Sequence, residues 1–318
     1  MRWQWLILLV LLGCSPRTTP VETPKIDEAF RPPDEAARQA AIGEVPSEQK
    51  AWFSTAHYEP IQEPHSMDWL ANQHEAGQTF DEFVASQPNR PEGSRSVVYF
   101  QPIGEFGEDA PSRQKLSQFT SAFFGLKVEW LDPLPTEGLG VTERLNELEG
   151  ERQLLTGDLL KALKKRLPDD AYCELGVTMA DLYPREGWNY VFGAASLKDR
   201  VGVYSFARYD PAFYGNDRKD GWRELVLLRS CKVLAHETGH MFGLAHCIHF
   251  DCLMNGSNHL AETDSHPLFL CPVCLRKLHS SVGFDPVARY RALESFCREN
   301  GLSGEAQWLQ RRLAELAE

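Results

Sequence analysis

From residue 96 onward, short apolar runs alternate along the chain with longer segments of mixed polarity. Val97-Val98-Tyr99-Phe100 is β-branched and aromatic, a composition that predicts a strand. Further strands are expected at Leu126–Leu131, Cys173–Ala180, Tyr190–Ala195 and Val201–Ala207, and helices at residues 112–124, Asn146–Leu167 and Trp222–Phe242. Because strands alternate with helices, the pattern favours a sheet with right-handed crossovers.

The segments on either side of this central part differ from it in composition. Residues 14–45 begin rich in Pro, Thr and charge, as is typical of a flexible tether, and predict one short helix at 34–42. Residues 46–95 mix aromatic residues with Pro and Gly and form an N-terminal extension, in which Thr79 is expected to cap a helix. After residue 282, helices are predicted near Asp285–Glu299 and Ser303–Ala317, with apolar faces typical of packing surfaces.

The first thirteen residues have the pattern of a signal peptide. Arg2 precedes the apolar run Trp3–Leu12, which is too short to span a bilayer as a mature helix. Leu11-Leu12-Gly13-Cys14 resembles a bacterial lipobox, which implies cleavage before Cys14 and lipidation of that cysteine. We therefore expect a membrane-anchored protein of the bacterial cell envelope. An ordinary signal peptide and an unprocessed hydrophobic end are the alternatives.

Composition and charge predict a globular protein and limit the kinds of partner that it can bind electrostatically. The chain has 318 residues, of which 42% are hydrophobic and 25% charged, so a packed globular core is expected. Its formal net charge of −12 argues against electrostatic binding of nucleic acid or anionic membranes.

The most informative stretch begins at His236 and reads H-E-T-G-H-M-F-G-L-A-H-C-I-H-F-D-C-L-M. On a helix, His236 and His240 lie on one face and can share one Zn²⁺, with Glu237 placed as a general base. Gly243 allows the chain to leave the helix, so that His246 can return as a third ligand. Three protein ligands leave one position for water, which is the arrangement of a catalytic zinc.

Two family resemblances follow from this stretch. The extended pattern H-E-x-x-H-x-x-G-x-x-H, with Met254 eight residues after the third histidine, resembles the metzincin signature, in which this methionine forms the Met-turn beneath the metal. Cys247 and Cys252, followed by Cys271 and Cys274, extend the resemblance to archaemetzincins, although the last gap is sixteen residues where the family has about seventeen. The resemblance covers roughly residues 96–282.

The resemblance implies a zinc metallopeptidase with two Zn²⁺ ions per chain. His236, His240 and His246 would hold the catalytic ion, and the four cysteines would hold a structural one. The fold class implied is α+β, with a mixed twisted sheet, an active-site helix and a smaller C-terminal subdomain that carries the Met-turn and the structural zinc. Phe192, Gly193 and Ala194 would belong to an edge strand that binds an extended peptide substrate.

Several alternatives stay open from the sequence alone. Exported cysteines often form disulfides, so the four thiols could be paired instead of binding zinc. The strand at 189–195 could be a plain core strand. A non-catalytic zinc-binding lipoprotein would need the same ligands, but it would have no use for Glu237. Whether a peptidase of this kind trims N-termini or cuts internally is not visible.

Overall fold

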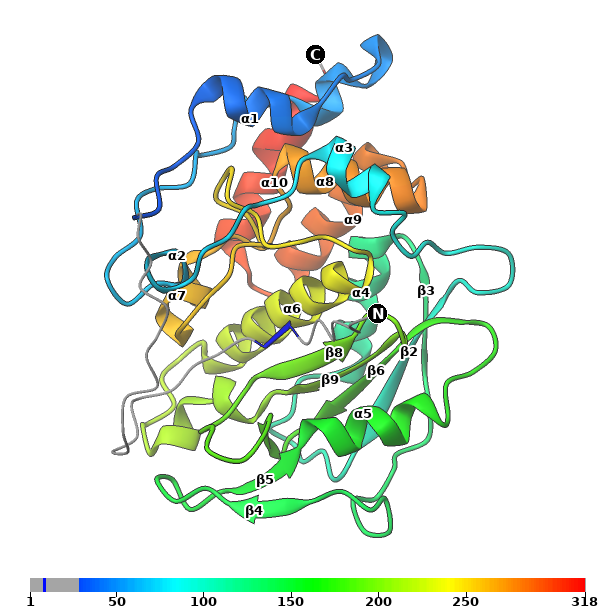
Figure 1. Ribbon diagram of the computed structural model, residues 1–318, viewed down its shortest axis with the longest axis vertical. Coiled ribbons are helices and arrows are strands. Elements are labelled where there is room, and N and C mark those ends of the chain that lie inside the picture. Colours follow the sequence, from blue (N-terminus) through cyan, green and yellow to red (C-terminus); the bar gives the residue numbers. More distant parts are fainter. Residues whose placement is uncertain (1–7, 10–28, 318) are drawn as a thin grey trace, which may run out of the picture.

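The computed structural model describes Leu8–Leu9 and residues 29–317, and its centre is a six-stranded sheet (Figure 1). The strands, in spatial order, are β1 (Leu8–Leu9), β8 (Gly193–Ser196), β9 (Val201–Ser205), β6 (Ala171–Thr178), β2 (Val97–Ile103) and β3 (Lys127–Trp130). The four strands from β9 to β3 are parallel, whereas β8 pairs antiparallel with β9 and with β1. The sheet is therefore mixed, as predicted.

Helices cover both faces of this sheet. One face packs against α4 (Arg113–Phe124) and α6 (Trp222–Met241), and the other against α5 (Thr156–Lys164) (Figure 1). Every residue of β6 is buried, which is expected of a central parallel strand enclosed on both faces. The main core lies between the sheet and α6, and a second, smaller core lies beneath α5.

The long helix predicted at Asn146–Leu167 is wrong. The structure places strand β5 (Arg152–Leu155) within this range, directly after β4 (Glu143–Leu145) and a turn, and α5 begins only at Thr156. These two strands form a second sheet with β7 (Asp181–Tyr183). Buried Gln153 donates from Nε2 to a carboxylate oxygen of Asp181 at 2.6 Å. A partner 28 residues away thus overrides the helical pattern of the apolar residues.

The N-terminal extension packs against the C-terminal helices (Figure 1). The extension contains α1 (Glu35–Ile42), a 3₁₀ helix at Ser47–Phe53, α2 (Trp69–Asn72) and α3 (Phe80–Ala85), and the C-terminal part contains α7 (Leu260–Ser265), α8 (Pro272–Val282), α9 (Pro286–Glu299) and α10 (Ser303–Glu315). Thr79 caps α3 through a capping box with Glu82, as expected. Two largely buried arginines join the parts, because Arg276 donates to the carbonyls of Ile42 and Glu44, and Arg312 donates to those of Ala51 and Trp52.

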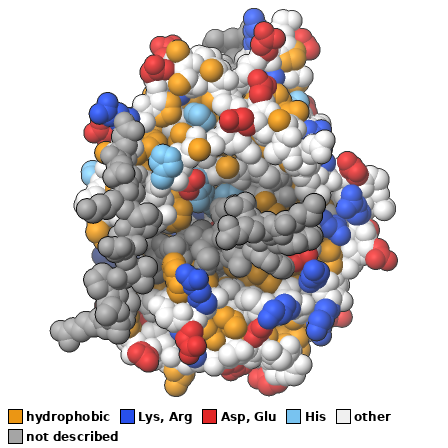
Figure 2. Space-filling view, in the orientation of Figure 1, with side chains coloured by type: hydrophobic (Ala, Val, Ile, Leu, Met, Phe, Trp, Pro, Cys, Tyr) orange, Lys and Arg blue, Asp and Glu red, His pale blue; other side chains and the backbone are white. Residues whose placement is uncertain are grey.

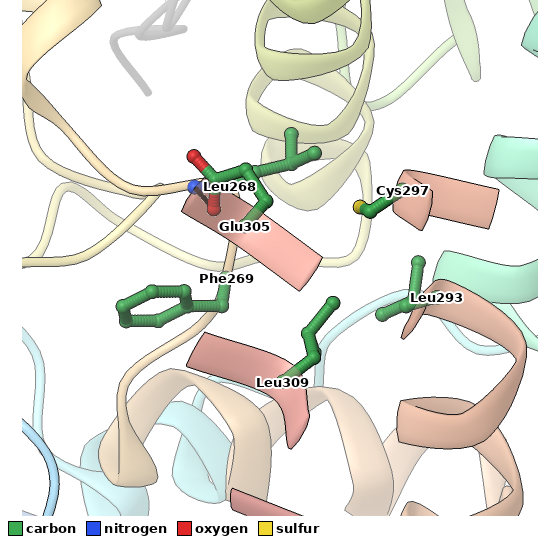
Figure 3. Close-up of a pocket in the computed structure, with 6 residues that line it drawn as sticks. All are labelled: Leu268, Phe269, Leu293, Cys297, Glu305 and Leu309. Carbon is green, nitrogen blue, oxygen red and sulfur yellow. Dashed lines mark hydrogen bonds between the residues drawn. The ribbon is translucent and has the colours of Figure 1, made fainter. Parts of the chain in front are cut away.

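Helices α9 and α10 hold the loop that leads into α8. Figure 3 shows a small, mainly apolar cavity where Glu305 of α10 lies beside Leu268, with Cys297 and Leu293 of α9 opposite. A carboxylate oxygen of Glu305 accepts from the backbone N–H of Leu268 at 3.3 Å. Burial raises the pKa of Glu305. The C-terminal helices therefore fix the position of the segment that precedes Cys271.

Short 3₁₀ helices at Ala207–Tyr209 and Pro211–Tyr214 connect β9 to α6.

Cys14, the predicted lipidation site, lies outside the described residues. Within the described part, none of the helices combines the length and apolar character needed to cross a membrane. Cys173, Cys231 and Cys297 are fully buried free thiols, as expected of small hydrophobic side chains.

Glu174 of β6 gives a testable pH dependence of stability. Its side chain is fully buried, and neither carboxylate oxygen has a hydrogen-bond partner among the described residues. Burial raises its pKa from 4.5 to about 7, although Arg166 opposes the shift. The folded protein thus keeps a proton that the unfolded chain releases. Stability is therefore lost as the pH rises from about 4.5 to about 7, by on the order of 3 kcal/mol.

Glu174→Gln should remove this loss, because the amide keeps the shape of the carboxyl group without its charge. We expect the variant to exceed the parent in unfolding free energy by on the order of 3 kcal/mol at pH 8 and to differ little at pH 5. Urea denaturation at the two pH values measures the effect. Glu108→Gln, at an exposed position, is the matched control. Equal stability of variant and parent at pH 8 would contradict the prediction.

Candidate active site

Three histidine side chains meet above the sheet, beside helix α6. His236 and His240 are one turn apart on α6, and their Nε2 atoms are 3.0 Å apart. Two nitrogens bound to one tetrahedral Zn²⁺ would be separated by roughly 3.3 Å. One ring nitrogen from each of His236, His240 and His246 lies within 4.8 Å of the others. Histidine side chains also gather on the molecular face seen in Figure 2. The structure therefore brings together the three residues whose spacing predicted a metal site.

Gly243 brings His246 back to the helix. Helix α6 ends at Met241, and Gly243 has a φ of +84°, a conformation that glycine adopts without strain. Its N–H donates to the carbonyl of His240 at 2.8 Å. A Cβ atom at this position would lie 2.9 Å from the Cβ of Pro88, so the packing also excludes a side chain. The helix break that the sequence predicted is thus present.

Each histidine is oriented by a hydrogen bond from its second ring nitrogen. Nδ1 of His236 lies 2.8 Å from the carbonyl of Leu253, and Nδ1 of His240 lies 2.6 Å from that of Leu244. Because a carbonyl can only accept, Nδ1 carries the proton and Nε2 keeps its lone pair. Burial lowers the pKa of His236 to about 3 and that of His240 well below its usual value, so both rings are neutral. Neutral imidazoles are the form that binds metal.

His246 is oriented by a residue of the N-terminal extension. Its Nδ1 lies 2.7 Å from a carboxylate oxygen of Glu75, and its buried Nε2 has no partner among the described residues. The same oxygen accepts from the indole N–H of Trp69 at 2.9 Å, and the Trp69 ring packs edge-on against His246. Burial alone would raise the pKa of Glu75, but the hydrogen bond from His246 helps to lower it. Glu75 therefore faces the imidazole as a carboxylate.

Glu237 lies beside the histidines with both carboxylate oxygens buried and without a partner among the described residues. It lines one cavity together with His236 and Phe192. Burial raises the pKa of Glu237 to about 8. A dication held by the histidines would act in the opposite direction and favour the carboxylate. The orphaned oxygens and the three free Nε2 lone pairs are what a bound Zn²⁺ and its water would satisfy.

Met254 packs against helix α6 at Gly239, next to His240 in the chain. A Cβ atom on Gly239 would lie only 2.6 Å from the Met254 sulfur, so the side chain packs into space that glycine leaves open. Leu253 and Met254 also bind the neighbouring elements through their backbone, since Leu253 accepts from His236 and Met254 accepts from the N–H of Cys247 at 2.8 Å. This turn therefore couples the helix to the segment that carries the cysteines.

The four cysteines form a second candidate metal centre. The sulfur atoms of Cys247, Cys252, Cys271 and Cys274 all lie within 4.8 Å of one another and are buried. Cys247 and Cys271 are 3.6 Å apart, which is far longer than a disulfide bond and close to the roughly 3.8 Å between two thiolates on one tetrahedral Zn²⁺. All four are free thiols, so the disulfide alternative does not hold in this structure.

The local backbone favours thiolates at this centre. Cys271 is the N-cap of α8, so Cys271 and Cys274 lie at the positive end of the helix dipole. Cys252 accepts backbone N–H groups from Met254 at 3.4 Å and from Cys271 at 3.2 Å. Hydrogen bonds from the other three thiols, Cys252 first, lower the pKa of Cys247 well below its usual value.

Asn255 supports this centre and had no signal in the sequence. Its side-chain oxygen accepts from the N–H of Cys252 at 2.7 Å, and its amide donates to the carbonyls of Cys247 and Phe250. The loop between the first two cysteines is therefore closed by a single side chain.

A third cluster, formed by Asp68, His259 and Glu262, is held together by hydrogen bonds. His259 Nε2 lies 3.2 Å from Asp68, and Glu262 accepts from the backbone N–H groups of Trp69 and Asn258. Its polar atoms are thus engaged in joining α2 to α7. We interpret it as a structural connection between the extension and the C-terminal part.

Glu75 is expected to influence metal affinity without touching the metal. Glu75→Ala removes the acceptor that orients His246, and losing such an outer hydrogen bond typically weakens metal binding by about 10–100-fold. Competition with a chromophoric chelator measures the affinity, and Glu75→Gln should recover part of it by keeping an acceptor oxygen. Glu63→Ala, at an exposed position of the same extension, is the control. An unchanged zinc affinity in Glu75→Ala would exclude this role.

Comparisons with known proteins point to one family. A family model described as peptidase family M54 matches residues 147–280. Archaemetzincin-2 of Pongo abelii is 42% identical over 263 residues, which cover 74% of this chain and 73% of that protein. Archaemetzincin-1 of Homo sapiens is 36% identical over 254 residues, which cover 71% of this chain and 51% of that protein. The crystal structure of archaemetzincin from Methanopyrus kandleri is 28% identical, covers 61% of this chain and 99% of that chain, and gives a TM-score of 0.46.

Proposed function

The chain belongs to the archaemetzincin family of zinc metallopeptidases, peptidase family M54, and we propose that it hydrolyses peptide bonds at the three-histidine centre with Glu237 as general base. One observation carries the assignment of the base. Glu237 is buried next to the histidines, and neither of its oxygens has a partner among the described residues. An unsatisfied buried carboxyl group is costly, and Glu174 shows that burial without a partner does not by itself mark a base. What distinguishes Glu237 is its position in the cavity that His236 also lines.

The donor set fits Zn²⁺. His236, His240 and His246 present three neutral nitrogens, which is the ligand set of a catalytic zinc. When bound, Zn²⁺ supplies a Lewis acid for the scissile carbonyl and lowers the pKa of a water molecule towards neutrality. Glu237 takes the proton of that water and passes it to the leaving amine. The four thiols fit a structural Zn²⁺, which would hold the loop after His246.

Strand β8 offers the backbone against which a peptide can be held. Ala194 and Ala195 pair on one side with β9 and on the other with Leu9 and Leu8, in antiparallel register. The pairing with this two-residue segment supports peptide binding by strand addition, because it uses the backbone groups that a substrate would use. Phe192 precedes the strand and faces the cavity of Glu237. We therefore assign Phe192, Gly193 and Ala194 to substrate binding.

A peptide library tests the proposed function. The purified protein should cleave some members, lose cleavage when a chelator removes the catalytic zinc, and regain it when zinc is restored. Mass spectrometry of the products also separates removal of N-terminal residues from internal cuts. If the zinc-loaded protein cuts nothing in a broad library, a zinc-binding role without turnover becomes the better account.

The proposed location of the enzyme rests on the sequence of the first fourteen residues. A lipid on Cys14 would anchor the protein to a membrane of the bacterial cell envelope, with the catalytic part outside the bilayer. The wild-type chain should then partition into the membrane fraction and carry fatty acid at its new N-terminus. Cys14→Ser should release it into the soluble fraction, and retention of this variant in the membrane would contradict the proposal.

A further inference from the structure

The cavity beside Glu237 has a charged end that the hydrolytic chemistry does not use. The cavity is small, with a volume of about 30 Å³ for the centres of water-sized molecules, which is room for roughly two waters or for the end of one substrate side chain. Its lining includes Phe192, Tyr209, Lys232, His236, Glu237 and Thr263. The lining therefore combines the catalytic groups with aromatic and aliphatic side chains and with polar side chains such as His266. Lys232 adds a cation to this lining.

Lys232 is held in place by hydrogen bonds, without an ion-pair partner among the described residues. It lies one turn before His236 on α6 and is 3% exposed. Its ammonium donates to the carbonyls of Thr263 at 3.2 Å and Asp264 at 2.9 Å. An ammonium has three N–H donors, so one donor is left for a group inside the cavity.

The carboxylates that act on Lys232 through their charge are Glu305, Asp264 and Asp251, and none of them forms an ion pair with it among the described residues. The side chain of Asp264 accepts two hydrogen bonds from Arg229, at 2.8 and 2.5 Å, and so does not neutralise Lys232 directly. Glu305 and Asp251 act on Lys232 only through their charge, and no ion pair joins them to it within the described residues. Burial lowers the pKa of Lys232, which reflects the cost of keeping a charge there. A carboxylate entering the cavity would offset that cost.

The direction of a bound peptide decides which side chain enters. A segment that pairs antiparallel with β8 runs from Ala195 towards Phe192, as Leu8 and Leu9 do opposite Ala195 and Ala194. Phe192 lines the cavity, so a peptide bound in this way presents to it the residue that follows the cleaved bond. The ammonium belongs to a residue one helical turn, about 5.4 Å, from His236, which favours a long side chain.

We propose that this cavity selects glutamate in the position after the cleaved bond, through a hydrogen-bonded ion pair between its carboxylate and the ammonium of Lys232. The inference rests on the proposed peptidase function and names its substrate class. Sites that present a hydrogen-bonding group to a substrate discriminate strongly against an analogue that lacks the partner, because the site's own buried group is then left unsatisfied. An apolar residue such as leucine leaves the third N–H of Lys232 without an acceptor.

Four peptides that differ only in this position, with Glu, Gln, Leu or Lys, test the proposal. In the parent enzyme kcat/KM should be at least tenfold higher for Glu than for Leu, and lowest for Lys. Lys232→Met should abolish the preference for Glu over Leu, whereas Lys232→Arg should keep it. The ratio of two substrates within one variant does not depend on the fraction of folded protein. Equal cleavage of Glu and Leu peptides by the parent, or an undiminished preference in Lys232→Met, would overturn the proposal.

Binding to an inactivated enzyme separates this inference from the peptidase function. Glu237→Gln leaves the cavity and Lys232 in place, so calorimetry with the same peptides reports the selection without turnover. The Glu peptide should bind at least tenfold more tightly than the Leu peptide. Equal or undetectable binding of both would reject the selection, whatever the outcome of the cleavage assay.

Discussion

Glu237→Gln is expected to lose nearly all peptide cleavage while keeping its fold and both zinc ions. The substitution preserves the shape of the side chain but removes the carboxylate that accepts a proton. Loss of a general base typically lowers the rate by about 10²–10⁴-fold. The three histidines keep their Nε2 lone pairs, because their orienting hydrogen bonds go to Leu253, Leu244 and Glu75 and not to Glu237.

Three measurements on purified protein check this result together. The cleavage rate should be lost, whereas the zinc content and the melting temperature should stay at the parent's values. Glu224→Gln, an exposed position in the first turn of the same helix, should behave as the parent in all three. Cleavage by Glu237→Gln at the parent's rate would show that another group is the general base and that Glu237 is not.

Cys271→Ser is expected to have the largest effect on stability. It removes one of the four thiols from the buried cluster. The hydrogen bond from the backbone N–H of residue 271 to the Cys252 sulfur does not use the side chain, so the substitution does not remove it directly. Structural Zn²⁺ contributes apparent binding free energies of about 10–16 kcal/mol, which become folding free energy. Losing the ion should therefore unfold the C-terminal part or lower the melting temperature sharply.

Controls distinguish loss of the metal from loss of a buried thiol. Cys231→Ala removes a buried cysteine outside the cluster and should cost far less. His236→Ala should leave a folded protein without activity. Metal analysis should return two zinc ions for the parent and one for Cys271→Ser. A melting temperature that falls only in the histidine variant would assign the roles of the two centres in reverse.

The candidate metal ligands could be predicted from the sequence because much of their geometry is local. His236 and His240 are fixed by one turn of helix, and Gly243 by a backbone conformation that favours glycine. Cys247 follows the third histidine directly, and the spacings C-x₄-C and C-x-x-C of the four cysteines indicate the second site as well. In each case a short stretch of chain sets which side chains can meet.

The features that could not be predicted from the sequence depend on contacts between segments that are distant in the chain. Gln153 belongs to a strand because Asp181 pairs with it, although its own neighbourhood has a helical pattern. Lys232 faces a cavity closed by Phe192 and by the loop that follows Met254, and nothing in its local sequence marks it. Glu75 belongs to no motif in the sequence, and only the fold places it against His246. Spacing rules cannot find such residues, because the distance that matters is not along the chain.

The contact between Glu75 and His246 makes the catalytic centre discontinuous in the chain, because the two residues are 171 positions apart. A fragment that begins at residue 96 would retain all seven candidate zinc ligands and would still lack the carboxylate that orients the third histidine. Proteolytic clipping between Glu75 and β2 could therefore leave a protein that contains both metals and catalyses poorly. For this chain, metal content and the presence of the signature motif would be incomplete measures of an intact enzyme.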